Sequence, residues 1–292
     1  ILLTFLSYHM LFVGTVIGFV GSALLVVSVL LPSPQPTVPR GIYDRTTRGM
    51  RIYLATPRLR GLLSLNLAAA AAGAMVLVNT VVLVRSDLGL GDTQVAIALG
   101  AFGGGSMLAA LLLPLFLDNR PDRPMMIGGA AVLVASLLVL SLMSLILDTR
   151  WIPLLAGWFV IGIGYSVVLT PSGRLLKRSA HAEDRPAVYA AQFALSHACW
   201  LVTYPLAGWL ITVAEPTTAF AILALLAAAG LFSGIVLWPK DDTGIFEHTH
   251  DDLPKDHPHV QDGRSHSHPI VIDDYHQHWP RLKEPDSGQQ NS

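Results

Sequence analysis

Seven apolar stretches, each about as long as a membrane-spanning helix, dominate this 292-residue chain. They cover about Leu11–Leu31, Gly61–Val84, Thr93–Leu117, Met125–Leu147, Trp151–Thr170, Ala187–Val213 and Thr217–Trp238. A helix needs about 20 apolar residues to cross the hydrocarbon core of a bilayer. In lipid, a chain satisfies its backbone polar groups within helices or within a closed barrel. The pattern therefore predicts an all-α fold, a polytopic helical bundle embedded in a membrane.

Charge divides the chain into two regions. Residues 1–240 hold 15 Lys and Arg against 9 Asp and Glu, whereas residues 241–292 hold 4 against 11. We expect the last span of an N-terminal half (1–31), a central cytoplasmic loop (32–60), a six-span half (61–240) and a disordered tail rich in His and Asp (241–292). Because the sequence starts with Ile1 inside an apolar run, we also expect it to be a fragment of a longer protein.

The loops between the spans set the expected orientation, because cytoplasmic loops are enriched in Lys and Arg. Residues 32–60 hold six arginines against one acid, Asp44, and residues 171–186 are also basic. These loops, together with residues 118–124, alternate with loops that are poor in cations. We expect them and the tail to lie in the cytoplasm, in a multi-pass protein of the plasma or inner membrane.

Several glycines lie within the spans at spacings that favour close helix packing. Gly100 and Gly104 form a G-x-x-x-G pair, and Ala101 and Gly105 repeat the spacing one residue later. Small residues at this spacing let membrane helices approach closely. We expect tight helix contacts there.

Two loops and the number of spans carry a resemblance to a known family. The basic stretch RTTRGMRIYLATPRLRGLLSLN leads into a span, six spans follow it, and the loop LPLFLDNRPDRPMM combines acidic with basic residues. In these features the chain resembles the C-terminal part of an efflux-type transporter of the major facilitator superfamily. The resemblance implies alternating access, a midplane site shared with a missing N-terminal half of the same protein, and a gating role for Asp118 and Arg123.

Polar side chains inside the spans are the candidate substrate pathway, because an unpaired polar group is expensive in lipid. The most polar span is 187–213. On a helix its candidates form two adjacent stripes, which are Gln192, Ser196, Cys199 and Thr203 on one and His197, Trp200 and Tyr204 on the other. His197 is the candidate proton carrier. Asn66, Asn79 and Tyr165 are further candidates, and hydrogen bonds between helices are the alternative interpretation.

The tail holds eight of the chain's eleven histidines. They form four H-x-H pairs, which are His248 and His250, His257 and His259, His266 and His268, and His276 and His278. Imidazole suits transition-metal ions, and the composition resembles the tails of nickel-resistance permeases. The pairs are therefore candidate metal ligands, and a merely solubilising tail is the alternative. No other cofactor is expected.

The sequence therefore predicts a secondary active transporter that exports its substrate in exchange for protons. Divalent transition-metal ions are one predicted substrate, and small organic compounds, as in multidrug efflux, are the alternative. A membrane metal sensor or buffer that transports nothing is a different possibility. The sequence lacks H-E-x-x-H, G-x-S-x-G and phosphate-loop motifs, so we expect no enzyme, and the acidic tail argues against nucleic acid. The expected partners are the lipid bilayer, a small molecule or metal ion, and protons.

Overall fold

The computed structural model describes residues 8–29, 41–117, 121–147, 150–240, 245–249, 265–269, 271–273 and 279. The chain divides into two compact units, Ile1–Pro39 and Arg40–Ser292. In the first unit, helix α1 (Tyr8–Ser28) is apolar, and nearly all of its described side chains are exposed. The prediction of an apolar helix at this position is therefore confirmed, with its end three residues earlier than expected.

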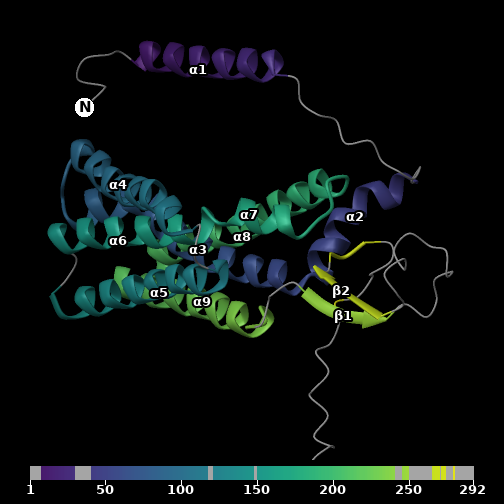
Figure 1. The fold of residues 1–292 in the computed structure, drawn as a ribbon. Coiled ribbons are helices and arrows are strands. Elements are labelled where there is room, and N and C mark those ends of the chain that lie inside the picture. Colours follow the sequence, from purple (N-terminus) through teal and green to yellow (C-terminus); the bar gives the residue numbers. More distant parts are fainter. Residues whose placement is uncertain are drawn as a thin grey trace, which may run out of the picture. The chain divides into compact units, whose positions relative to one another are not determined.

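The second unit is a bundle of helices (Figure 1), which confirms the predicted fold class. Six segments within the described residues are long and apolar enough to cross a membrane. They are formed by α3 (Pro57–Val82) with the π-helix η2 (Leu83–Asp87), α4 (Asp92–Leu117), α5 (Asp122–Leu147), α6 (Trp151–Leu169) with α7 (Ser172–Arg178), α8 (Arg185–Val213) and α9 (Pro216–Leu237). They correspond to six of the seven predicted spans, and at the seventh position α1 contains a shorter apolar segment, Phe12–Ser28.

Helix α3 is the most enclosed of the spans, and in Figure 1 it runs through the middle of the bundle. It packs against α9, α8, α6 and α5. Of its most apolar window 72% is buried, against 17% in α4 and in α8. Residues 68–74 of α3 read AAAAAGA, and small side chains let neighbouring membrane helices approach closely. The alanine run therefore places α3 where it touches most of its neighbours.

Helices α4 and α6 cross at two glycines. A Cβ atom on Gly105 of α4 would lie 2.0 Å from the carbonyl oxygen of Phe159, and one on Gly162 of α6 would lie 2.1 Å from that of Phe102. Both positions therefore exclude any side chain. The predicted G-x-x-x-G pair differs, because Cβ atoms on Gly100 and Gly104 would meet nothing within 4 Å. The close contact uses the second repeat of the spacing, at Gly105.

Part of the basic segment 32–60, which we expected to be a loop, forms helix α2 (Ile42–Ala55). One face of this helix is buried and includes Arg48, Ile52 and Tyr53. The helix packs against α8, and a Cβ atom on Gly49 would lie 2.0 Å from the carbonyl oxygen of Ala187. The arginines suggested a cytoplasmic loop, but Arg48 is buried against Asp184, the residue that precedes α8.

The described part of the tail contains two short strands, β1 (Ile245–Thr249) and β2 (Ser265–Pro269), which pair antiparallel. Their register places His248 opposite His266 and Phe246 opposite His268. The amino-acid sequence did not predict this strand pair. The H-x-H spacing has the two-residue period of a strand, but the strands hold too few apolar residues to stand out.

Candidate functional site

A cavity of about 490 Å³ opens in the bundle between α3, α6 and α8. Its walls combine small apolar, aromatic and polar side chains. They are Asn66, Ala69, Ala70 and Leu77 from α3, Tyr165 and Leu169 from α6, and Gln192, Ser196, His197, Trp200 and Tyr204 from α8. None of these described lining residues is Asp, Glu, Lys or Arg. The cavity is therefore suited to a ligand without a localised charge.

Three aromatic rings follow one another along one wall of this cavity. The centroids of Tyr165 and Trp200 lie 6.2 Å apart with the rings edge to face, and those of Trp200 and Tyr204 lie 4.7 Å apart. Trp200 reaches α3 at Gly73, where a Cβ atom would lie 2.5 Å from the indole ring. The absence of a side chain at Gly73 thus makes room for Trp200. The rings offer apolar faces and edges to a bound molecule.

The polar side of the cavity contains two carboxamides, Asn66 and Gln192. The hydroxyl of Tyr53, which is fully buried on α2, donates a hydrogen bond to Oε1 of Gln192. Burial raises the pKa of Tyr53 above its ordinary value, so this hydroxyl stays protonated. Asn66 is only 4% exposed, and neither its Oδ1 nor its Nδ2 has a partner among the described residues. Gln192 is therefore fixed by a hydrogen bond from Tyr53, whereas no described group forms a hydrogen bond with the amide of Asn66.

His197 and Ser196 are both anchored to one carbonyl group of their own helix. Nδ1 of His197 lies 2.8 Å from the carbonyl oxygen of Phe193, and Oγ of Ser196 donates to the same oxygen at 3.0 Å. A carbonyl oxygen only accepts, so Nδ1 carries the hydrogen. In the neutral ring, Nε2 of His197 is then the nitrogen that can take up a proton.

Three of the residues predicted for the substrate pathway do not line this cavity. Cys199 is half-buried on α8. Thr203 is fully buried, and its hydroxyl has no partner among the described residues. Asn79 is fully buried, and its Nδ2 donates to the carbonyl oxygen of Ala207 at 3.1 Å. Asn79 thus makes the interhelical hydrogen bond that we offered as the alternative interpretation.

Charged residues gather at the end of the bundle where α5, α7 and α8 begin. Asp122 is 3% exposed, contacts the guanidinium of Arg174, and lies 3.7 Å from that of Arg178. Arg123 donates to the carbonyl oxygens of Trp238 at 2.8 Å and Ile235 at 3.1 Å, at the end of α9. Asp118, which we expected to share a gating role with Arg123, lies outside the described residues. The sequence did not single out Asp122, because one acid in a loop of mixed charge gives no sign that it will be buried.

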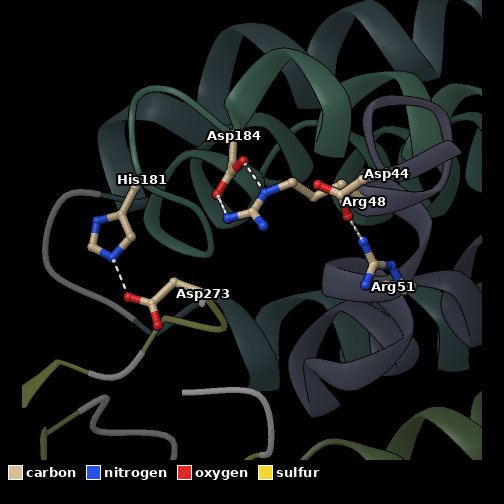
Figure 2. A network of polar contacts seen from close by, with 6 residues as sticks. All are labelled: Asp44, Arg48, Arg51, His181, Asp184 and Asp273. Carbon is tan, nitrogen blue, oxygen red and sulfur yellow. Dashed lines mark hydrogen bonds and ion pairs between the residues drawn. The ribbon is translucent and has the colours of Figure 1, made fainter. Parts of the chain in front are cut away.

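A second charged cluster joins α2, the loop before α8 and the tail (Figure 2). Arg48 contacts both carboxylate oxygens of Asp184, at 2.5 and 2.8 Å, and both side chains are buried. On the exposed side of α2, Arg51 pairs with Asp44. The ring of His181 lies 3.2 Å from the carboxylate of Asp273, and this hydrogen bond is the main cause of the raised pKa of His181.

The described tail residues beyond β2 contact the same end of the bundle. Ile272 is 5% exposed and belongs to the hydrophobic core. The guanidinium of Arg58 lies 5.1 Å from the ring centre of Trp279, a geometry in which cation and ring attract each other.

The predicted metal ligands are only partly described. His248, His266 and His268 lie in the paired strands, whereas His250, His257, His259, His276 and His278 fall outside the described residues. Among the side chains that the structure describes, no group of three or more His, Cys, Asp or Glu is placed to hold a metal ion.

The structure brings together residues that the sequence had divided between two stripes of α8. Gln192, Ser196, Trp200 and Tyr204 all line the cavity, with His197 beside them. Their spacing of four residues was the signal that identifies this face, because residues four apart lie one above the other on a helix. The contribution of Tyr53 had no such signal, since it depends on how α2 docks.

The chain matches a known family over most of its length. The sequence profile of the Major Facilitator Superfamily matches residues 62–248, from the start of α3 into β1. No curated protein matches the chain. The matched region contains five of the six membrane-length segments in full, the first of the six from residue 62 onward, and every lining residue of the cavity. The chain therefore belongs to the major facilitator superfamily, a family of secondary transporters, and is a multi-pass membrane protein.

Proposed function

We propose that this chain forms half of the pathway of a secondary active transporter that exports small, uncharged organic compounds. The observation that carries the proposal is the cavity between α3, α6 and α8. It combines three aromatic rings with amide, hydroxyl and imidazole groups. None of its described lining residues is Asp, Glu, Lys or Arg. A largely apolar pocket with a few polar groups is the usual form of an organic ligand site.

The same lining argues against a bare transition-metal ion as the transported species. Such ions bind to several imidazole, thiolate or carboxylate groups at once. His197 is the single imidazole among the described lining residues, and Cys199 lies elsewhere on α8. The cavity therefore favours an organic substrate over the metal ion that the tail composition suggested.

We propose further that a second six-span half completes this pathway. Transporters of this superfamily place the substrate at the interface between two such halves. Helices α4 and α8 have only 17% of their most apolar windows buried, so they offer the largest surfaces for such a partner or for lipid. One end of the bundle contains the hydrogen bonds that Arg48, Arg123 and Arg174 donate. By the positive-inside rule, this end and the tail face the cytoplasm.

Proton coupling is the proposed source of energy, and His197 is the proposed carrier within this half. Its Nδ1 is committed to the carbonyl of Phe193, so a proton that enters from the cavity binds at Nε2. Imidazole changes its charge within the physiological pH range. A His197→Gln variant should therefore transport with a weaker dependence on the imposed pH gradient than the unmodified protein does.

Transport by the full-length protein in liposomes tests the proposal. Efflux of a neutral, planar fluorescent compound and of Ni²⁺ is measured with and without a pH gradient, in the unmodified protein, in Trp200→Ala and in Trp209→Ala. Trp200 lines the cavity, whereas Trp209 lies on the same helix and is 60% exposed. We expect organic efflux to fall strongly in Trp200→Ala and to persist in Trp209→Ala. Flux of Ni²⁺ without organic flux, or an unchanged Trp200→Ala variant, would contradict the proposal.

A second candidate function is metal binding by the tail, and the register of the strand pair favours it. The register pairs His248 of one strand with His266 of the other. Imidazole is a good ligand for transition-metal ions. Calorimetry with Ni²⁺ on the intact protein should show weaker binding in a His248→Gln, His266→Gln double variant. Unchanged affinity would assign metal binding, if any is measured, to other histidines.

A further inference from the structure

Asn66 is the one lining residue of the cavity whose side chain is buried with no partner for either end of its amide among the described residues. Asn79, thirteen residues later on the same helix, is also buried, but its Nδ2 donates to the carbonyl oxygen of Ala207, so only its Oδ1 has no partner among the described residues. Buried polar groups in proteins are nearly always hydrogen-bonded, and a buried polar group without a hydrogen bond lowers the stability of the fold. The unmet amide of Asn66 therefore points to a ligand that supplies both a donor and an acceptor.

Gln192 adds a second polar group of defined orientation. Its Oε1 accepts the hydrogen bond from Tyr53, so its amide nitrogen is the end that can donate into the cavity. Asn66 thus offers one donor and one acceptor, and Gln192 offers a further donor. A ligand with one N–H group and one carbonyl group satisfies this set, because a carbonyl oxygen has two lone pairs and can accept from both amides.

The aromatic wall defines the rest of the ligand. Tyr165, Trp200 and Tyr204 present linked rings to the cavity, and rings prefer to stack on or meet the edge of a flat aromatic molecule. No described lining residue carries a carboxylate, ammonium or guanidinium group to pair with a ligand charge. A flat, uncharged molecule with a polar edge is the best fit.

We propose that Asn66 is a specificity-determining residue that binds the adjacent N–H and C=O groups of an amide or lactam on a planar, uncharged aromatic compound. In this pairing Oδ1 of Asn66 accepts the ligand N–H, and Nδ2 donates to the ligand carbonyl oxygen. The two parallel hydrogen bonds close a ring, as between two bases. The inference rests on the proposed function in taking this cavity as the site of the transported compound.

Two nearly isosteric compounds separate this pairing from simple apolar binding. 2-Quinolone carries adjacent N–H and C=O groups on a flat bicyclic ring, and coumarin has a ring oxygen in place of the N–H. Coumarin would place this oxygen against Oδ1 of Asn66 with no hydrogen between them. We expect the unmodified protein to bind 2-quinolone about tenfold more tightly than coumarin, the usual value of one buried hydrogen bond.

The experiment measures the affinities of both compounds by calorimetry on the full-length protein in lipid nanodiscs. Asn66→Leu and Asn66→Ala should bring the ratio of the two affinities close to one, chiefly by weakening 2-quinolone binding. Asn79→Ala, the matched control, should keep the ratio, because Asn79 does not line the cavity. The comparison in the unmodified protein needs no variant and remains decisive if a variant misfolds.

Equal affinities in the unmodified protein, binding of neither compound, or a ratio that survives in both Asn66 variants would overturn the inference. Efflux assays keep the two proposals apart. Loss of the predicted ratio with efflux of neutral aromatics intact refutes the role of Asn66 alone. A correct ratio in a protein that shows no flux of organic compounds refutes the proposed function alone.

Discussion

The buried ion pair between Arg48 and Asp184 should hold α2 on the bundle, and its removal should release that helix. Arg48 and Asp184 have side chains only 9% and 3% exposed, and two hydrogen bonds join them. Asp184→Asn keeps the size of the side chain but removes its charge and turns one acceptor into a donor that faces the guanidinium. Breaking a buried pair on one side costs about 3–5 kcal/mol.

The exposed pair on the same helix provides the matched control. Arg51 and Asp44 have side chains 60% and 34% exposed, and exposed pairs contribute about 0.2–1 kcal/mol. Asp44→Asn should therefore change the stability of α2 by well under 1 kcal/mol. The same chemical change thus has two expected effects that differ several-fold, because the first pair is buried and has two hydrogen bonds, whereas the second is exposed and has one.

Hydrogen exchange of residues 41–55, followed by mass spectrometry on the protein in nanodiscs, measures both effects. A loss of 3 kcal/mol corresponds to exchange faster by about two orders of magnitude. We expect acceleration on this scale for Asp184→Asn, confined to α2 and its contacts on α8, and little change for Asp44→Asn. Equal acceleration in the two variants would show that the buried pair does not anchor α2 and would refute the reasoning.

Three further predictions concern other parts of the molecule. Gly162→Val should prevent folding or destabilise the protein by several kcal/mol, because a Cβ atom there would lie 2.1 Å from the carbonyl oxygen of Phe102; thermal unfolding in detergent tests this, and a stable variant would contradict it. His181 has a raised pKa because of its hydrogen bond to Asp273, so its stabilising effect should be complete below its ordinary pKa of 6.5 and vanish as the pH rises through the raised value. The stability difference between the protein and His181→Asn, measured across this range, should follow that course, and a difference independent of pH would exclude it. Asn66→Leu should leave the empty protein at least as stable as before, since the amide lost has no partner among the described residues; a large loss of stability would mean that Asn66 is satisfied within the bundle.

The sequence was sufficient to predict the helical bundle, because a run of about 20 apolar residues can form little other than a membrane helix. It also identified several cavity residues, such as Gln192, His197 and Tyr165, since polar groups are rare inside apolar spans. It did not identify α2, whose arginines looked like those of a solvated loop. Only the folded structure shows that Arg48 donates a hydrogen bond to Asp184, which lies 136 residues later in the chain.

The same limit applies to the glycines and to the charged loops. Spacing alone could not distinguish Gly100, which faces open space, from Gly105, which touches the backbone of α6. Both satisfy the same pattern, and the rotation of α4 about its axis decides between them. Likewise, the sequence could not show that Asp122 is buried, because its burial depends on the packing of α7 against the start of α5.

The polar face of α8 has a consequence for the biosynthesis of the protein. The groups that line the cavity give α8 the lowest mean hydropathy of the six membrane-length segments, whereas α9 has one of the highest. Each polar residue near the centre of a helix opposes its partition from the translocon into lipid. A turn of only two residues, Ala214 and Glu215, separates α8 from α9. We therefore expect α8 to enter the bilayer together with α9 as a helical hairpin, so that a ribosome-bound chain ending before α9 would leave α8 poorly inserted.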